Sequence, residues 1–238
     1  TTNALCNGVS DGTATLNISG GVSPYNEDWG SNEPLALSAG VHVFIITDTN
    51  GCTLIDSVLI TEPPLINVTA TAINVSCNGG NDGGISFNLS GGTPDYSISV
   101  AGFNQTLING VTSYTTPLSL SAGTYSYIIL DTNGCSLVDS IQIIESSGIS
   151  TNENIVNVSC NGGNDGSIDL SISGGTGPYS FLWSNSDTTE DVSNLSYGIY
   201  TYTITDAQGC LFSDTASINQ PDTINVIPQT TNVSCANG

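Results

Sequence analysis

The sequence predicts an all-β protein, a tandem array of small immunoglobulin-like β-sandwich domains, on three observations. A motif around Cys77 returns almost unchanged around Cys160, with a looser copy at Cys6 and a truncated one at Cys235. These cysteines stand roughly 70 to 85 residues apart, which is the size of one small domain per copy. Short runs of alternating apolar and polar residues recur in every copy, and helix signals are absent.

We therefore expect three repeats and the start of a fourth, with boundaries at residues 1–63, 64–146, 147–222 and 223–238. The first strand of the first repeat is expected to be partly missing. Within each copy the cysteine motif, called the cassette loop below, precedes an alternating strand that ends at two glycines. This strand is expected at residues 14–19, 85–90 and 168–173.

A second strand follows a proline and a tyrosine, and in the first and third copies it reaches Trp29 or Trp183. A corner of the type Leu-Ser-x-Gly then leads into the most apolar strand, with Tyr125, Tyr200 or, in the first copy, His42 two positions after the glycine. That strand ends in an Asp-x-x-Gly-Cys turn, called the Gly-Cys hairpin below, at residues 48–52, 131–135 and 206–210. About seven short strands, a core tryptophan and a corner tyrosine are typical of an immunoglobulin-like sandwich.

The composition is strongly acidic and excludes several functions. The chain has no Lys or Arg, one His and 21 Asp plus Glu, for a formal net charge of −21. Nothing is available to neutralise phosphates, so nucleic-acid binding and adhesion to an anionic membrane surface are excluded. No apolar stretch is long enough to insert into a membrane. Charge repulsion favours a soluble, non-aggregating chain, and the lack of Lys and Arg removes every trypsin site.

Seven cysteines recur at fixed positions without a CxxC pair, which fits structural disulfides in an oxidising exterior. The interval from each Gly-Cys hairpin to the next cassette loop is the same in all three cases. This constancy favours the pairs Cys52–Cys77, Cys135–Cys160 and Cys210–Cys235. The alternative is a bond within each repeat, which has to connect opposite poles of a sandwich: Cys6–Cys52, Cys77–Cys135 and Cys160–Cys210. A staggered bond between repeats is the third option, because sequence alone does not give connectivity.

Catalysis has no support in the sequence, and we expect no enzymatic activity and no cofactor. His42 is the only side chain able to serve as the base for a serine or cysteine nucleophile, and it occupies the place of the corner tyrosines. The acidic residues of the loops are interpreted as turn formers, because the spacings of known calcium loops are missing. Calcium binding is the weaker alternative for these residues: Asp11, Asp48, Asp82, Asp131, Asp165 and Asp206.

Four stretches between Cys160 and Pro221 carry a family resemblance. They are Cys-Asn-Gly-Gly-Asn-Asp-Gly-Ser-Ile, Gly-Gly-Thr-Gly-Pro-Tyr, Leu-Ser-x-Gly-x-Tyr and Asp-x-x-Gly-Cys. Together they resemble the SprB repeat of giant surface adhesins in gliding Bacteroidota. The first copy departs at Val9, Ser10 and His42, and the second copy lacks the tryptophan. The resemblance implies an extracellular, cell-surface location, export by the type IX secretion system, and a role in adhesion and gliding.

One further motif gains meaning from this resemblance. An aspartate followed by Ser or Thr and a small or branched apolar residue is similar to the O-glycosylation consensus of Bacteroidota. It recurs at the same place after the cysteine of every Gly-Cys hairpin, and it occurs twice elsewhere. The candidate acceptors are Ser57, Ser140, Thr215, Thr188 and Thr223.

We interpret the chain as a stalk or filament segment of a secreted adhesin. Its expected partners are neighbouring repeats of the same chain, external surfaces or polysaccharides, and, through regions outside this sequence, the secretion and gliding machinery. One alternative is an array of carbohydrate-binding modules with these aromatic stacking platforms: Tyr25, Trp29, Tyr179 and Trp183. The other alternative is a stalk made rigid by Ca²⁺.

Overall fold

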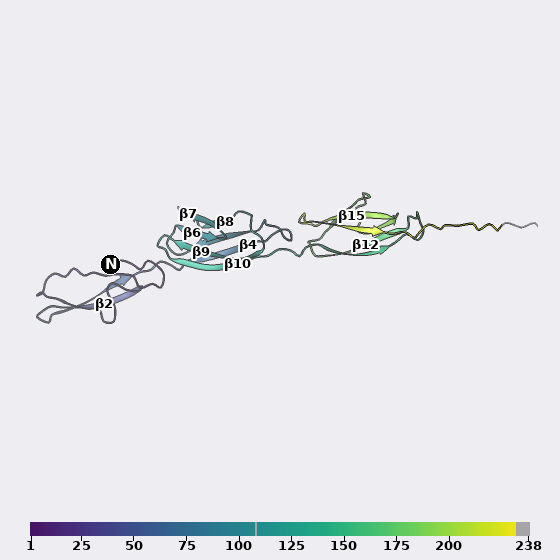
Figure 1. Cartoon of the computed structure of the whole chain (residues 1–238). Helices are drawn as coiled ribbons and strands as arrows, with labels where there is room; N and C mark the ends of the chain where they lie inside the picture. Colours follow the sequence, from purple (N-terminus) through teal and green to yellow (C-terminus); the bar gives the residue numbers. More distant parts are fainter. Residues whose placement is uncertain (108, 232–238) are drawn as a thin grey trace, which may run out of the picture. The chain divides into compact units, whose positions relative to one another are not determined.

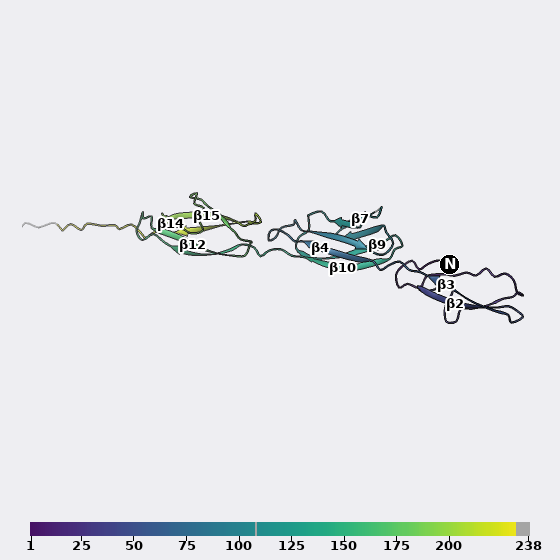
Figure 2. The same ribbon diagram turned by 180° about the vertical axis from the view of Figure 1, so that it is seen from behind.

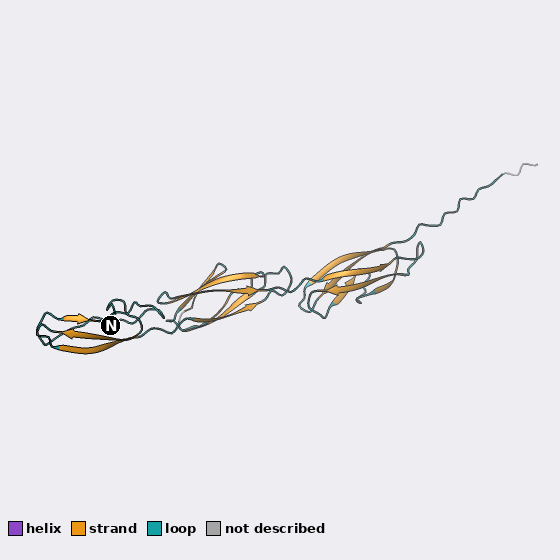
Figure 3. Ribbon diagram, turned by 90° about the horizontal axis from the view of Figure 1, so that it is seen from below, coloured by secondary structure: helices purple, strands orange, loops and turns teal. Residues whose placement is uncertain are grey.

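The computed structural model describes residues 1–107 and 109–231 of the chain. The described part contains sixteen β-strands and no helix, which confirms the all-β, immunoglobulin-like fold class (Figures 1 and 3). Buried apolar side chains form three separate clusters, one in each predicted repeat. Among the described residues, no helix is long and apolar enough to cross a membrane.

The second repeat is the most complete sandwich. One sheet has the order β4-β5-β8, with bounds Asn67–Ile73, Gly84–Ser90 and Ser113–Thr115. The other has the order β10-β9-β6-β7, with bounds Ser136–Ile143, Gly123–Asp131, Tyr96–Val100 and Phe103–Leu107. All pairs are antiparallel. The β6–β7 hairpin lies in the segment where this copy is longer than the others. Its second strand, β7, is labelled in Figure 2.

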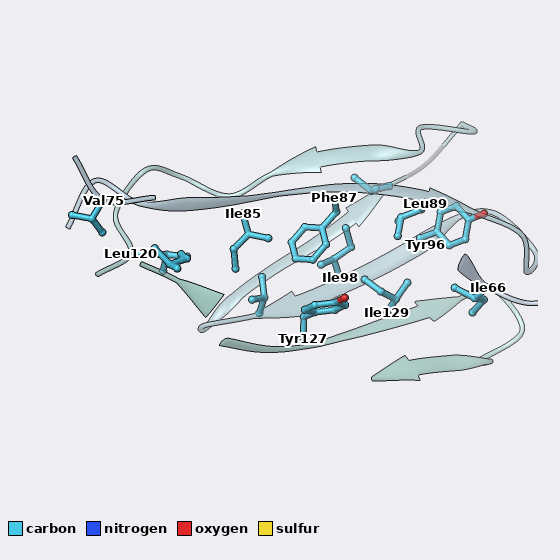
Figure 4. Close-up of a cluster of buried hydrophobic side chains, with 13 residues drawn as sticks. Ile66, Val75, Ile85, Phe87, Leu89, Tyr96, Ile98, Leu120, Tyr127 and Ile129 are labelled. Atoms are coloured by element: carbon cyan, nitrogen blue, oxygen red, sulfur yellow. The ribbon is translucent and has the colours of Figure 1, made fainter. Parts of the chain in front are cut away.

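The core of the second repeat lies between these two sheets. Figure 4 shows Phe87 of β5 facing Ile98 of β6 and Tyr127 and Ile129 of β9, and all four side chains are buried. Their alternation along each strand is the pattern expected when only one face of a sheet is covered. Phe87 and Tyr127 meet edge to face, with ring centroids 5.0 Å apart.

The third repeat keeps the same plan with fewer strands. Its sheets are β11-β12-β14, with bounds Ser150–Val156, Gly166–Ser173 and Val192–Leu195, and β13-β15-β16, with bounds Ser180–Trp183, Gly198–Thr205 and Leu211–Ile218. Trp183 is buried against Tyr202, and its Nε1 donates to the Thr189 carbonyl at 3.0 Å. The tryptophan is therefore a core residue with its polar atom paired.

The first repeat has one regular sheet, β1-β2-β3, with bounds Asn26–Asp28, Gly40–Thr47 and Thr53–Ile60. The strand expected at residues 14–19 does not form. Only the isolated bridges Thr2↔Thr13 and Gly12↔Leu37 mark the second layer. The expectation was wrong here because a regular strand needs a paired neighbour, and residues 14–19 have no strand beside them.

Close packing divides the chain into two compact units. One holds residues 1–75 and 79–144, and the other holds residues 76–78 and the chain from residue 145 onward. Residues 76–78 belong to the cassette loop between β4 and β5, yet they pack with the third repeat. The predicted repeat boundaries stay a prediction, and the start of a fourth repeat is described only as far as residue 231.

Candidate functional site: the disulfide junctions

The Gly-Cys hairpin is built around an aspartate. In the third repeat, Asp206 Oδ1 accepts the N–H groups of Gln208 and Cys210, both at 2.9 Å. Its Oδ2 accepts the Thr176 N–H at 3.0 Å and so ties the hairpin to the Gly174-Gly175 turn. Asp48 and Asp131 make the same contacts in their repeats. These carboxylates thus hold the hairpin backbone, as expected for turn formers.

The charge of these carboxylates is stabilised by the backbone. Burial, the largest single influence, raises the pKa of Asp206, but several backbone N–H donors, led by Cys210 and Thr176, outweigh it and lower the pKa. The Cys52 N–H is the main cause of the lowered pKa of Asp48. In the cassette loop, the side chain and N–H of Ser159 lower the pKa of Asp165.

The cassette loop is hydrogen-bonded to the last residues of the repeat to which it belongs. The side chain of Asn7 donates to the Pro63 carbonyl at 3.2 Å, and the loops of the second and third repeats repeat this contact through Asn78 to Ser146 and Asn161 to Pro221. A second contact comes from Glu62, whose Oε2 accepts the Gly8 N–H at 2.6 Å, and Gln220 accepts the Gly162 N–H in the same way. The loop of Cys160 has both contacts although its thiol is free, so these contacts do not require a disulfide.

Two disulfides join the cassette loop of one repeat to the Gly-Cys hairpin of the next. They are Cys6–Cys135 and Cys77–Cys210, with Cα–Cα distances of 5.6 and 5.5 Å. At the first of them, Asn133 Nδ2 also donates to the Leu5 carbonyl at 2.9 Å. The two bonded pairs, their cassette loops and their hairpins are called junctions below.

This connectivity corrects the favoured pairing. The expected Cys52–Cys77 and Cys135–Cys160 bonds do not form. Among the described strands, β3 pairs with β2 and β10 with β9, whereas β4 pairs with β5 and β11 with β12, so no antiparallel pair of strands brings these cysteines together. The expected Cys210–Cys235 bond is wrong too, since Cys210 is bonded to Cys77, and Cys235 lies outside the described residues.

The alternative bonds within a repeat are wrong as well. These were Cys6–Cys52, Cys77–Cys135 and Cys160–Cys210, and each links two poles of one sandwich that its strands keep apart. The staggered option is the one the structure has, since a cassette loop meets the hairpin of the following repeat. Cys52 and Cys160 are exposed free thiols.

A connector also docks onto the next repeat at each junction. We call residues 62–66, 145–149 and 220–224 the connectors. The Pro64 carbonyl accepts the Gly92 N–H at 2.7 Å, and the Ser147 carbonyl accepts the Gly175 N–H at 2.8 Å. A Cβ on Gly91 would lie 1.9 Å from the Leu65 carbonyl oxygen, so only glycine permits this approach.

The last residue of the connector fills a place beside the paired glycines. Ile66 is buried in the core of the second repeat, and Ile149 packs against the core of the third. Sequence reasoning missed both residues and the role of the glycines. The signal was present, because an isoleucine stands at one constant distance before each of three cassette cysteines, as Ile66, Ile149 and Ile224.

The other predicted site residues have structural roles or stay untested. His42 is buried at the corner, where its Nε2 donates to the Ser38 carbonyl at 2.8 Å, as Tyr125 and Tyr200 donate to Ser121 and Ser196. Trp29 and Trp183 are buried and so cannot act as stacking platforms for sugars, whereas Tyr25 and Tyr179 are half-buried and donate to the Gly20 and Gly174 carbonyls.

The metal and glycan predictions remain predictions. Within the described ranges, no group of three or more His, Cys, Asp or Glu gathers to hold a metal ion. Asp11 accepts the Leu5 N–H, a turn contact like that of Asp165. All five candidate glycan acceptors are exposed: Ser57, Ser140, Thr188, Thr215 and Thr223.

The fold and the junctions define the class of protein as a covalently linked array of immunoglobulin-like sandwiches. The model of the SprB repeat family matches residues 1–29, 69–102 and 152–188. Three segments of the chain, one in each repeat, thus match the SprB repeat, as the sequence motifs indicated, and the chain is a repeat region of the adhesin type. A search of curated proteins found no match.

A comparison with solved structures found matches of low sequence identity and low TM-score, among them proteins with several immunoglobulin domains. A 282-residue intimin fragment in complex with the Tir intimin-binding domain is 12% identical, with a TM-score of 0.34 and coverage of 64% of this chain and 63% of that one. The eight N-terminal domains of Down Syndrome Cell Adhesion Molecule are 10% identical, with a TM-score of 0.37 and coverage of 79% and 29%. The Bacteroides ovatus protein SGBP-B, in complex with a mixed-linkage heptasaccharide, is 16% identical, with a TM-score of 0.24 and coverage of 82% and 59%.

Proposed function

We propose that this chain is a stalk segment that transmits tension in a secreted cell-surface adhesin and that it has no enzymatic activity. The observation that carries the proposal is that the two disulfides overlap along the chain. Cys77, the start of the second loop, lies between Cys6 and Cys135, the ends of the first. Two loops that overlap in this way cannot be pulled open independently.

The overlap sets the greatest length to which the chain can be stretched. Between Cys6 and Cys210 the uninterrupted backbone measures about 700 Å when fully extended. With both bonds closed, the shortest covalent path passes from Cys6 to Cys135, back along the backbone to Cys77 and across to Cys210. That path is about 200 Å long when extended. A stalk with this connectivity transmits tension without releasing long unfolded loops.

Single-molecule stretching tests the mechanical part of the proposal. With handles at the two ends, the oxidised chain is expected to reach a plateau about 500 Å shorter than the same chain after reduction with dithiothreitol. A double variant, Cys135→Ser with Cys210→Ser, is expected to behave like the reduced chain. Equal maximum extensions for oxidised and reduced chains would rule out a load-limiting role for the disulfides.

The cellular part of the proposal rests on the SprB repeats. We infer export by the type IX secretion system, a position at the cell surface, and service in attachment and gliding. External surfaces or polysaccharides are the expected contacts. Antibodies against this segment are expected to label intact cells and to reduce gliding and attachment. Labelling only after cell lysis would contradict the proposal.

A further inference from the structure

The two tryptophans of the chain occupy the same place in their repeats but differ at the indole nitrogen. Trp29 packs on Phe44 with the ring centroids 4.9 Å apart. Trp183 packs on Tyr202 with the ring centroids 4.8 Å apart. The Nε1 of Trp183 donates to the Thr189 carbonyl, whereas the buried Nε1 of Trp29 has no hydrogen-bond partner among the described residues. A buried N–H without an acceptor is destabilising, so this one needs a physical explanation.

The difference comes from the length of the segment that follows each tryptophan. The corner leucine of the third repeat, Leu195, comes twelve positions after Trp183. The corner leucine of the first repeat, Leu37, comes only eight positions after Trp29. The longer segment contains β14 and supplies the Thr189 carbonyl, and the shorter one forms turns and no strand. Each segment connects a strand to a corner of its own repeat, so the difference arises within the repeat and involves no neighbour.

A hollow of about 480 Å³ lies beside Trp29 in the first repeat. Its lining consists of Trp29 and residues on both sides of it between Asn26 and Pro34. The two indole rings pack alike, and the Nε1 of Trp183 points to the loop that follows it. The Nε1 of Trp29 therefore points to the corresponding segment, which borders the hollow. The volume is in the range of small-molecule sites.

The hollow combines one unused hydrogen-bond donor with several unused acceptors. The carboxylates of Glu27 and Glu33 are exposed, and neither makes a hydrogen bond with any described part of the chain. Asp28 accepts the Gly30 N–H at 2.8 Å through Oδ1, and its Oδ2 is free. The chain has no Lys or Arg that could neutralise these groups. A ligand that satisfies this set accepts a hydrogen bond from the indole N–H and donates others to carboxylates.

We propose that this hollow binds one or two sugar units of a neutral saccharide. A hydroxyl accepts one hydrogen bond and donates another through the same oxygen, and a saccharide carries several hydroxyls side by side. An anion is repelled by the carboxylates, and an ammonium group cannot accept from the indole N–H. The indole ring is buried against Phe44, so recognition comes from its N–H edge and not from a sugar stacked on its face.

Binding requires a small movement of the chain. The nitrogen of Trp29 is buried, so a hydroxyl reaches it only when the exposed turn at Gly30 and Ser31 moves outward. A Cβ on Gly30 would meet nothing within 4 Å, so there is open space around this turn. The cost of the movement favours weak binding, with a dissociation constant in the millimolar range. The inference depends only on this hollow and does not require the stalk role, which the stretching experiment tests separately.

The test is a titration of the whole isotope-labelled chain followed by NMR, because two tryptophans give only two indole N–H signals. The variant Trp29→Phe identifies the signal of Trp29. Maltose, cellobiose and lactose are each added to about 0.1 M, which is enough to saturate a millimolar site. With at least one of them, the Trp29 signal should shift saturably and its exchange with water should slow. The Trp183 signal should not move, since its N–H is already paired.

Variants of the rim test which groups bind the sugar. The double variant Glu27→Ala with Glu33→Ala should weaken the affinity about tenfold, and the repeat should stay folded because both side chains are exposed and unpaired. Glu190→Ala, which removes an exposed carboxylate from the corresponding loop of the third repeat, is the matched control and should change nothing. No shift with any of the three disaccharides would overturn the proposal and would leave a buried water as the partner of the indole. So would a Trp29 shift that ethylammonium or calcium chloride produces and no disaccharide does.

Discussion

The two junctions are closed by the same contacts although their connectors differ. The first uses Glu-Pro-Pro-Leu-Ile at residues 62–66, and the second uses Glu-Ser-Ser-Gly-Ile at residues 145–149. The first also leaves a cavity of about 430 Å³ and the second one of about 200 Å³. Both junctions contain a disulfide, a hydrogen bond from the cassette asparagine to a connector carbonyl, and a hydrogen bond from a glycine N–H to a connector carbonyl. The comparison teaches that backbone contacts and cysteines define a junction, and that the three connector residues between the shared glutamate and the shared isoleucine are variable.

Removing either disulfide gives the largest expected effect. Cys135→Ser and Cys210→Ser should each lower the free energy of unfolding of the repeat that carries the hairpin by about 4 kcal/mol, because each bond closes a long loop of the unfolded chain. Hydrogen exchange during urea titration resolves the individual repeats. Cys52→Ser is the matched control and should have no effect, since Cys52 is free. A loss of stability in only one of the two variants would show that the two junctions do not stabilise their repeats equally.

The paired glycines give the next largest effect. Gly91→Ala and Gly174→Ala place a Cβ 1.9 and 2.0 Å from the connector carbonyls of Leu65 and Gly148, so each should cost about 3 kcal/mol. Gly20 has a similar positive φ but an open environment, and Gly20→Ala should cost only about 1 kcal/mol. Thermal unfolding of the three variants measures the difference. Equal costs would mean that φ alone, and not connector docking, demands glycine.

Exchanging the connector prolines should matter less. The double variant Pro63→Ser with Pro64→Ser places in the first connector the two serines that the second connector has at the same positions. We expect a loss of about 1 kcal/mol, mainly from greater freedom of the unfolded chain. Chemical denaturation gives the free energy, and disulfide mapping should still find Cys6–Cys135. A loss as large as that of Cys135→Ser would show that the connector sequence, and not the recurring contacts, closes this junction.

The lowered pKa values of the hairpin carboxylates Asp48 and Asp206 predict that the stability of their repeats changes with pH only under acidic conditions. The pKa of Asp206 in the folded protein is lowered from 3.8. The stability that its charge contributes is therefore fully present above the pKa of the unfolded chain. It is lost as the pH falls through the lower pKa of the folded protein. The urea midpoint of the third repeat should fall below about pH 4, and Asp206→Asn should weaken that dependence. An unchanged slope in the variant would assign the acid response to other carboxylates.

The separate elements of each junction could be recognised in the sequence, but the way in which they come together could not. The cassette loop, the Gly-Cys hairpin and the corner at His42 were all recognisable, because each depends on contacts between near neighbours in the chain. The constant interval from hairpin to cassette loop pointed to the wrong pairing, since it reflects only that length changes fall elsewhere in the repeat. Glu62 and Gln220, which hold the cassette loops, were missed because their partners lie at the far end of the repeat in sequence.

The sequence by itself determined the all-β fold class, the number of repeats and the local turns, because alternation, paired glycines and turn residues act over short distances. Only the tertiary structure decided that Cys6 bonds to Cys135 and Cys77 to Cys210, and that an isoleucine from the connector completes the core of the repeat it enters. The reason is physical. A disulfide forms between loops that meet in space, and which loops meet depends on the path of the whole folded chain rather than on any interval along it.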